Sequence, residues 1–252
     1  MIEIKKLKAH NDEKVILDIE NFAFRNDESY LIAGENGSGK SSFIKILAND
    51  IDEGKYQNLK INGEILVDGK DILSSISNRE EFNKEMCYVS QEDQFLTNNI
   101  GKELLLYYNL ANDKNISQKD IISTIKELNI EDLLMKTFFK SDLSEILKLK
   151  ISFLSGGQKK IVHIVRELVK NKEAQYLFFD EPLNNLDVKN ITFISNLINK
   201  ISNNKLLIMI SHCKIFPFIK KAVKLTDGMF QECTYNCLSC FGKSNDNGYY
   251  QE

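Results

Sequence analysis

Residues 34–42 of this chain read Gly34-Glu35-Asn36-Gly37-Ser38-Gly39-Lys40-Ser41-Ser42, and the fold is best deduced from them. An apolar run at residues 30–33 precedes this stretch, and a helical pattern at residues 43–48 follows it. A G-x-x-x-x-G-K-S sequence between a strand and a helix is typical of a phosphate-binding loop. Its glycines let backbone N–H groups approach an anion, and the helix adds the positive end of its dipole.

Two side chains at the end of this loop define the ligand further. Lys40 is expected to reach the β- and γ-phosphates, and the Ser41 hydroxyl is placed to ligate Mg²⁺. The loop therefore predicts a site for a nucleoside triphosphate together with Mg²⁺.

The composition is that of a globular protein with a substantial core. The chain has 252 residues, of which 42% are hydrophobic and 27% charged, and a formal net charge of −3. Without a basic excess to displace counterions from phosphates, a nucleic-acid partner is not favoured. No apolar run approaches the ~18 residues that span a bilayer. Residues 1–6 lack the apolar core of a signal peptide, so we expect a cytosolic chain with mostly reduced cysteines.

The N-terminal third has the pattern of a mixed β region. Residues 2–7 and 15–24 are expected to form strands of an antiparallel layer that leads into the phosphate loop. Residues 49–62 are polar and are expected to be irregular, whereas residues 64–72 predict a strand with an Asp-Gly hairpin turn. Another short strand is expected at residues 86–91, ending on Gln91.

Helical periodicity dominates from residue 104 to residue 149, and Ser117 with Asp120 forms a candidate capping box there. A second glycine-rich stretch follows, with the sequence Leu154-Ser155-Gly156-Gly157-Gln158, and it leads directly into an amphipathic helix. Two glycines before a helix expose N–H donors at a positive dipole end. The chain is therefore expected to contain two separate anion sites.

The C-terminal part predicts an α/β arrangement. Residues 175–179 are continuously apolar, as in a parallel strand buried on both faces, and Asp180 and Glu181 follow them. Carboxylates at the C-terminal end of such a strand lie where open α/β sheets bind ligands. A helix is expected at residues 188–201, and a strand at 206–210 brings Ser211 and His212 to the same edge.

Together these motifs resemble the nucleotide-binding domain of ATP-binding cassette (ABC) proteins, over residues 2 to 232. The matching motifs occur in family order, namely the phosphate loop (34–42), the glutamine loop (Gln91), the signature segment (residues 154–158), the Walker B strand (176–180) with Glu181, the D-loop (184–187) and the switch histidine (His212). The resemblance implies a phosphate-loop NTPase with a mixed central sheet, an antiparallel β subdomain and a helical subdomain at about residues 92–155. It divides the chain into a nucleotide-binding domain, residues 1–232, and a C-terminal tail, residues 233–252.

The resemblance also implies roles for individual residues. ATP would be bound by the loop residues Gly34, Glu35, Asn36, Gly37, Ser38, Gly39, Lys40, Ser41 and Ser42 and, from a second copy of the chain, by Ser155, Gly156, Gly157 and Gln158. Mg²⁺ would be held by Ser41, Gln91 and Asp180. The catalytic residues would be Glu181, which polarises the attacking water, with Gln91 and His212. The implied assembly is a head-to-tail homodimer, or a dimer with a paralogous subunit. His10 and His163 are expected to be structural.

Three features depart from the family pattern. The region that usually supplies an adenine-stacking aromatic reads Lys8-Ala9-His10-Asn11, which leaves either stacking by His10 or a loosely held base. The D-loop, residues 184–187, is more polar than usual. Residues 147–153 lack the sequence typical of exporters with fused membrane domains, which agrees with a separate subunit.

The tail carries Cys233, Cys237 and Cys240. This C-x3-C-x2-C spacing could converge thiolates on an iron–sulfur cluster or on zinc, but only three cysteines lie here, and a reduced tail is the simpler interpretation. Two functions fit the whole chain. It could be the ATP-hydrolysing subunit of a transporter, at the inner face of the cell membrane on a separate integral-membrane permease. Alternatively, it could be a soluble ABC ATPase that acts on cytosolic partners, as in iron–sulfur cluster assembly.

Overall fold

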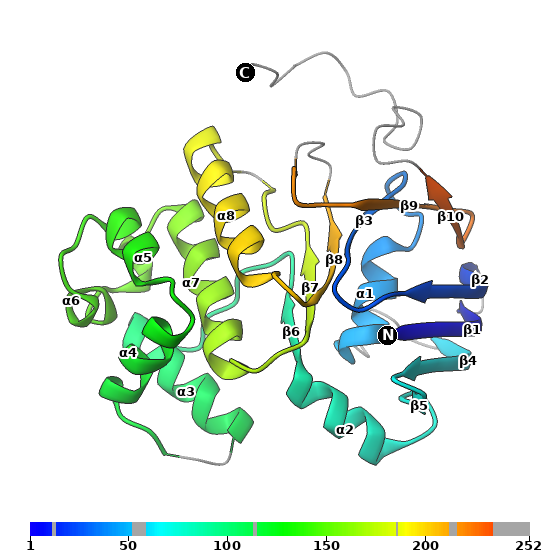
Figure 1. Cartoon of the computed structure of the whole chain (residues 1–252), viewed down its shortest axis with the longest axis horizontal. Helices are drawn as coiled ribbons and strands as arrows, with labels where there is room; N and C mark the ends of the chain where they lie inside the picture. Colours follow the sequence, from blue (N-terminus) through cyan, green and yellow to red (C-terminus); the bar gives the residue numbers. More distant parts are fainter. Residues whose placement is uncertain (12–13, 52–58, 113–114, 185, 212–215, 234–252) are drawn as a thin grey trace.

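The computed structural model describes residues 1–252 except 12–13, 52–58, 113–114, 185, 212–215 and 234–252. Two sheets organise the fold, and helices cover both faces of the larger one (Figure 1). The predicted α/β class is confirmed. Within the described part of the chain, every helix is too short or too polar to cross a membrane.

The smaller sheet is antiparallel, with the order β2-β1-β4-β5. Its strands are β1 (Ile2–His10), β2 (Val15–Phe24), β4 (Lys60–Val67) and β5 (Lys70–Asp71). The expected antiparallel layer and Asp-Gly hairpin are therefore confirmed. The expectation of irregular structure up to residue 62 is wrong at its end, because Lys60 pairs with His10 and Asn62 with Lys8. Polar side chains on this exposed end of β4 conceal the strand in the sequence.

The larger sheet has the order β10-β9-β3-β8-β7-β6, and every neighbouring pair except β10–β9 is parallel. Its strands are β3 (Ser29–Ala33), β6 (Met86–Val89), β7 (Tyr176–Asp180), β8 (Leu206–Ile210), β9 (Lys221–Thr226) and β10 (Met229–Cys233). All residues of β7 and β8 are buried, as the continuous apolar runs predict. Because the central strands are parallel, the segments that follow them meet at one edge.

One helix, α1 (Lys40–Ala48), lies between the two sheets (Figure 1). Its residues Phe43, Ile44 and Leu47 share a core with β1, β2 and β4 and with one face of the larger sheet. This packing fixes the position of the N-terminus of α1, which directly follows the phosphate loop in the chain.

The opposite face of the larger sheet is covered by α7 (Gly156–Lys170) and α8 (Val188–Ile201). A group of further helices packs on the outer side of α7 and consists of α3 (Ile100–Asn112), α4 (Gln118–Glu127), α5 (Glu131–Phe138), α6 (Leu143–Leu147) and the short η1 (Ile151–Phe153). The Ser117–Asp120 capping box is confirmed at the start of α4.

One helix has no counterpart in the sequence prediction. Phe82 is the buried residue of helix α2 (Ile76–Glu85). The helix therefore lacks the apolar face from which a sequence pattern would predict it. Its Arg79 side chain donates to the carbonyl oxygens of Ile46 (3.2 Å) and Leu47 (2.7 Å), and so closes the C-terminal end of α1.

Candidate functional site

The phosphate loop has the backbone conformation that its glycines predict. Gly39 is the N-cap of α1 and has φ +100°, a left-handed value that favours glycine. A Cβ atom at this position would lie 2.7 Å from the carbonyl oxygen of Ile16, so any side chain would also collide with β2. Gly37 has φ +82° as well. The loop therefore depends on glycine for both conformation and space.

Lys40 lies inside this loop. Its ammonium group donates to the carbonyl oxygens of Gly34 (2.9 Å) and Glu35 (2.8 Å), and the residue is only 6% exposed. Burial lowers the pKa of Lys40, and the negative charges of Glu181 and Asp180 oppose that shift. The ammonium group is therefore held by the loop carbonyls, in a position to contact a phosphate bound by the loop.

Asp180, at the end of β7, faces Ser41 of α1. The Ser41 hydroxyl donates to Asp180 Oδ1 over 3.1 Å, and Asp180 is fully buried. Burial raises the pKa of Asp180; the neighbouring Glu181 raises it further, and the Ser41 hydrogen bond acts against both. Among the described residues, the second carboxyl oxygen of Asp180 has no hydrogen-bond partner. An unpaired buried carboxylate oxygen beside a hydroxyl is the kind of ligand set that Mg²⁺ prefers.

Glu181 stands one residue further, in an uncommon backbone conformation. Its φ is +51°, which is unusual for a residue with a side chain, and its N–H donates to the carbonyl oxygen of Ile210 over 3.0 Å. Two amides face its carboxylate. Asn184 Nδ2 donates over 2.8 Å, and Gln91 Nε2 lies 3.5 Å away. The structure thus brings Gln91 and Glu181 together, as expected.

One open cleft of about 630 Å³ is lined by Ile16 of β2, by Lys14, which precedes that strand, and by residues described above, namely Gly37, Gly39, Lys40, Ser41, Gln91, Glu181 and Asn184. Lys14 and Ile16 carry no motif, and they were missed because only the fold places them opposite the loop. His10 is not among the described residues that line the cleft. The described lining includes the aliphatic Ile16 and Lys14 and holds no aromatic ring, so the stacking residue for the base stays a prediction.

The signature segment lies outside this cleft, as far as the described residues show. Ser155 caps α7: its hydroxyl accepts from the Gln158 N–H (3.3 Å), and Gln158 Oε1 accepts from the Ser155 N–H (3.1 Å). Ser155 and Gly156 are exposed, whereas Gly157 is buried against the Asn190 side chain. Gln158 is therefore engaged in shaping the helix end, and Ser155 and Gly156 are presented to solvent.

Two expectations fall outside the described residues. His212 directly follows the buried Ser211 but lies outside the described residues. Cys237 and Cys240 of the tail also lie outside them. Within the described ranges, no group of three or more His, Cys, Asp or Glu residues could hold a metal ion.

Comparison with known proteins settles the family. A family model described as ABC transporter matches residues 17–184, which is more than half of the chain. The chain belongs to the ABC transporter family. The ABC domain of this chain therefore includes the phosphate loop, the signature segment and Glu181, which all lie within the matched residues.

Curated relatives of this ABC domain are much longer proteins. Leptomycin B resistance protein pmd1 of Schizosaccharomyces pombe is 26% identical over 151 residues, which are 60% of this chain and 10% of that protein. A putative export ATP-binding/permease protein of Rickettsia felis is 30% identical over 155 residues, which are 60% of this chain and 24% of that protein. The chain thus spans only about a tenth to a quarter of the length of these relatives.

Solved structures share the fold of the ABC domain. The dimeric structure of MJ0796, a bacterial ABC transporter cassette, matches with a TM-score of 0.72 and 21% identity over 94% of this chain and 100% of that one. A bacterial ABC exporter with ATP bound matches with a TM-score of 0.71 and 22% identity over 93% of this chain and 38% of that one. At these identities the likeness concerns the fold.

Proposed function

We propose that this chain is the ATP-binding and ATP-hydrolysing subunit of a membrane transporter, and that ATP drives its dimerisation. One observation carries the proposal. The cleft with Lys40, Ser41 and Glu181 does not include the signature segment among its described residues, while Ser155 and Gly156 are exposed at the N-terminus of α7. Each copy therefore offers two incomplete anion sites, and a second copy completes both.

The residues of the cleft have separate tasks in ATP binding. Lys40 exchanges its contacts with the loop carbonyls for the β- and γ-phosphates. The buried hydroxyl of Ser38 has no hydrogen-bond partner among the described residues, so it is available to a phosphate oxygen. Ser41, Asp180 and Gln91 would hold Mg²⁺, which supplies charge neutralisation at the phosphates when bound. In the dimer, the dipole of α7 from the second copy adds to this charge compensation.

Glu181 is the residue proposed to activate the attacking water. Its carboxylate accepts from Asn184, and Gln91 approaches it from the opposite segment, so the group is oriented before substrate arrives. His212 is proposed to contact the γ-phosphate from the end of β8. Hydrolysis transfers the γ-phosphoryl group to water, and departure of the resulting phosphate removes the charge that joins the two copies, so the dimer then opens.

The partner is proposed to be an integral-membrane permease that docks in a second groove. This docking groove has a volume of about 510 Å³ and runs between the end of α1, the glutamine loop and the face of α3 and α7 that carries Tyr107 and Arg166. Its lining includes acidic and basic side chains, among them Lys45, Asp50 and Lys170. The groove touches Gln91 directly, so a helix seated there would sense the nucleotide site. The relative from Rickettsia felis, which is named a putative export ATP-binding/permease protein, supports this choice.

The substitution Glu181→Gln tests the shared site. It keeps the shape of the side chain but removes the base, so hydrolysis should fall by about 10²-fold or more while ATP binding persists. With ATP and Mg²⁺ the variant should elute from gel filtration as a dimer, and without nucleotide as a monomer. Glu173→Gln makes the same change at an exposed position and should behave as the unmodified chain. An ATP-bound but monomeric Glu181→Gln variant would contradict the proposal.

A further inference from the structure

Lys160 of α7 is a buried cation that the ATP-binding site does not use. The residue is 4% exposed and lies one helical turn after Gly156. Its ammonium group contacts three oxygen atoms, namely the carbonyl oxygens of Gln91 (2.9 Å) and Ser90 (3.3 Å) and Asp93 Oδ1 (2.6 Å). An ammonium has three donors, so all of them are used on this one segment. A lysine near the positive end of a helix dipole is otherwise unfavourable, and these contacts compensate for it.

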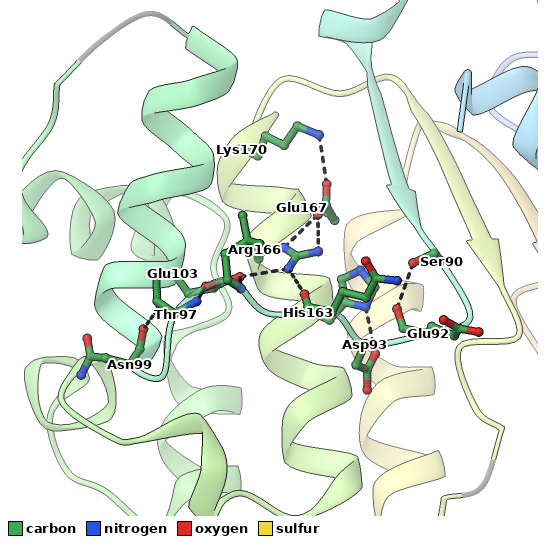
Figure 2. Close-up of polar contacts among 12 residues, drawn as sticks. Ser90, Glu92, Asp93, Thr97, Asn99, Glu103, His163, Arg166, Glu167 and Lys170 are labelled. Carbon is green, nitrogen blue, oxygen red and sulfur yellow. Dashed lines mark hydrogen bonds and ion pairs between the residues drawn. The ribbon is translucent and has the colours of Figure 1, made fainter. Parts of the chain in front are cut away.

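The next turn of α7 holds the same carboxylate. His163 is 2% exposed, and its Nδ1 lies 2.9 Å from Asp93 Oδ1 (Figure 2). Burial lowers the pKa of His163, and the contact with Asp93 opposes that shift. Since a carboxylate can only accept, Nδ1 is the donor in this contact. Burial raises the pKa of Asp93, but the contacts with His163 and Lys160 outweigh it and bring the pKa below its ordinary value. Asp93 thus remains a carboxylate that ties two turns of α7 to the segment after Gln91.

A third turn of α7 fixes the far end of this segment. Arg166 Nη1 donates to the carbonyl oxygen of Gln94 (2.5 Å) and to Glu103 (3.1 Å), which is fully buried. Glu103 in turn accepts from the N–H groups of Leu96 (3.2 Å) and Thr97 (2.8 Å). Figure 2 shows the part of this network that joins His163 to Asp93, Arg166 to Glu103 and Glu103 to Thr97. Residues 90–97 are here called the Gln91 segment. Among these contacts between described residues, those of Lys160 reach the main chain of Gln91 itself.

We propose that Lys160 is a positioning residue that couples the signature end of α7 to Gln91 of the same chain. The inference rests on the proposed dimer, in which the signature of one copy contacts the nucleotide of the other while Gln91 serves the nucleotide of its own copy. When α7 engages or loses the partner's nucleotide, Lys160 moves the main chain of Gln91 with it. Occupancy of one site thereby sets the hydrolysis rate of the other.

Two full-length copies joined by a long Gly/Ser linker make this coupling measurable. The first copy is active, and the second carries Lys40→Ala, so that the signature of the first copy faces an empty site. With Lys160 intact, the hydrolysis rate of the first site should be at least about fivefold lower than beside an intact second copy. With Lys160→Met in the first copy, the two rates should differ by less than about twofold.

The matched control is Lys159→Met, the same change one residue earlier on α7, outside the contacts described above. This control should keep the fivefold dependence. Since Lys160→Met leaves the Asp93 carboxylate with His163 as its one partner among the described ion pairs, a second variant, Lys160→Met with Asp93→Asn, removes the uncompensated charge. The loss of dependence must persist in this double variant. A purely structural role would lower stability and both rates without changing their ratio.

The outcomes separate the two levels of the proposal. If the tandem protein with two intact copies does not hydrolyse ATP, the proposed function fails. If it hydrolyses ATP but Lys160→Met retains the full dependence on the second site, or the unmodified pair shows none, the coupling role of Lys160 is overturned and the proposed function stands.

Discussion

At the scale of single residues, the two glycines of the signature segment differ in their surroundings. A Cβ atom at Gly156 would meet no described atom within 4 Å, whereas one at Gly157 would lie 2.3 Å from Asn190 Nδ2 and 2.9 Å from Asn190 Cβ. Asn190 itself is held by Asp187, the N-cap of α8, through its N–H (2.8 Å) and Nδ2 (3.0 Å). Gly157 is therefore required by packing between α7 and α8, whereas Gly156 has open space around it, on the side where the proposed dimer would place the partner's nucleotide.

This difference predicts opposite effects of two alanine substitutions. Gly157→Ala should reduce the free energy of unfolding by about 1–3 kcal/mol through overpacking, as measured by urea denaturation. Gly156→Ala should leave it within about 0.5 kcal/mol, yet impair the ATP-dependent dimer of the Glu181→Gln variant. In an Asn190→Gly background the cost of Gly157→Ala should shrink by more than half. Equal costs in both backgrounds would show that the contact with Asn190 is not the cause.

At the scale of elements, regular patterns made most of the fold predictable. Helix α8 has the bounds expected from its apolar face and its Asp187 cap, and the strands β7 and β8 follow from unbroken apolar runs. Helix α2 could not be predicted, because it is tied to the fold by the hydrogen bonds of Arg79 to α1 and has no apolar stripe. Within the site, motifs made of consecutive residues, such as the phosphate loop, could be predicted from the sequence. The Lys160–Gln91 contact could not be predicted, because it joins residues 69 positions apart in the sequence.

The role of α2 predicts the effect of Arg79→Met. The substitution keeps much of the apolar stem but removes the donors to the carbonyl oxygens of Ile46, Leu47 and Ile72. We expect a loss of about 1–3 kcal/mol in the free energy of unfolding, since these carbonyls would lose charge-assisted partners. Arg79→Lys should recover part of the loss. Hydrogen exchange should quicken first in the last turn of α1, and unchanged exchange there would contradict the capping role.

At the scale of the whole molecule, the nucleotide cleft and the docking groove meet at the Gln91 segment, which also contacts α7. Gln91 lines both, and Arg166 and His163 line the groove side. A partner in the groove, the cleft and the signature end of α7 are therefore mechanically connected through one short segment. Such an arrangement suits a subunit that converts ATP binding into movement of an attached protein.

The docking proposal predicts that the chain is recovered from cells with a multi-spanning membrane protein. Asp50→Lys reverses a charge at the groove and should lower that recovery about tenfold, since 1.4 kcal/mol of lost affinity suffices. Asp132→Lys, an exposed position on α5, is the matched control and should not change it. ATP hydrolysis by the isolated chain should be similar in both. Recovery only in complexes without a membrane protein would favour the soluble ABC ATPase instead.

The contacts of Lys40 with Gly34 and Glu35 have a kinetic consequence. They brace the loop from within, so we expect its shape to change little between nucleotide binding and product release. The rate of nucleotide exchange would then depend on diffusion and on how quickly the Lys40 ammonium breaks its two hydrogen bonds to the carbonyls. Both steps are fast compared with the opening and closing of a dimer.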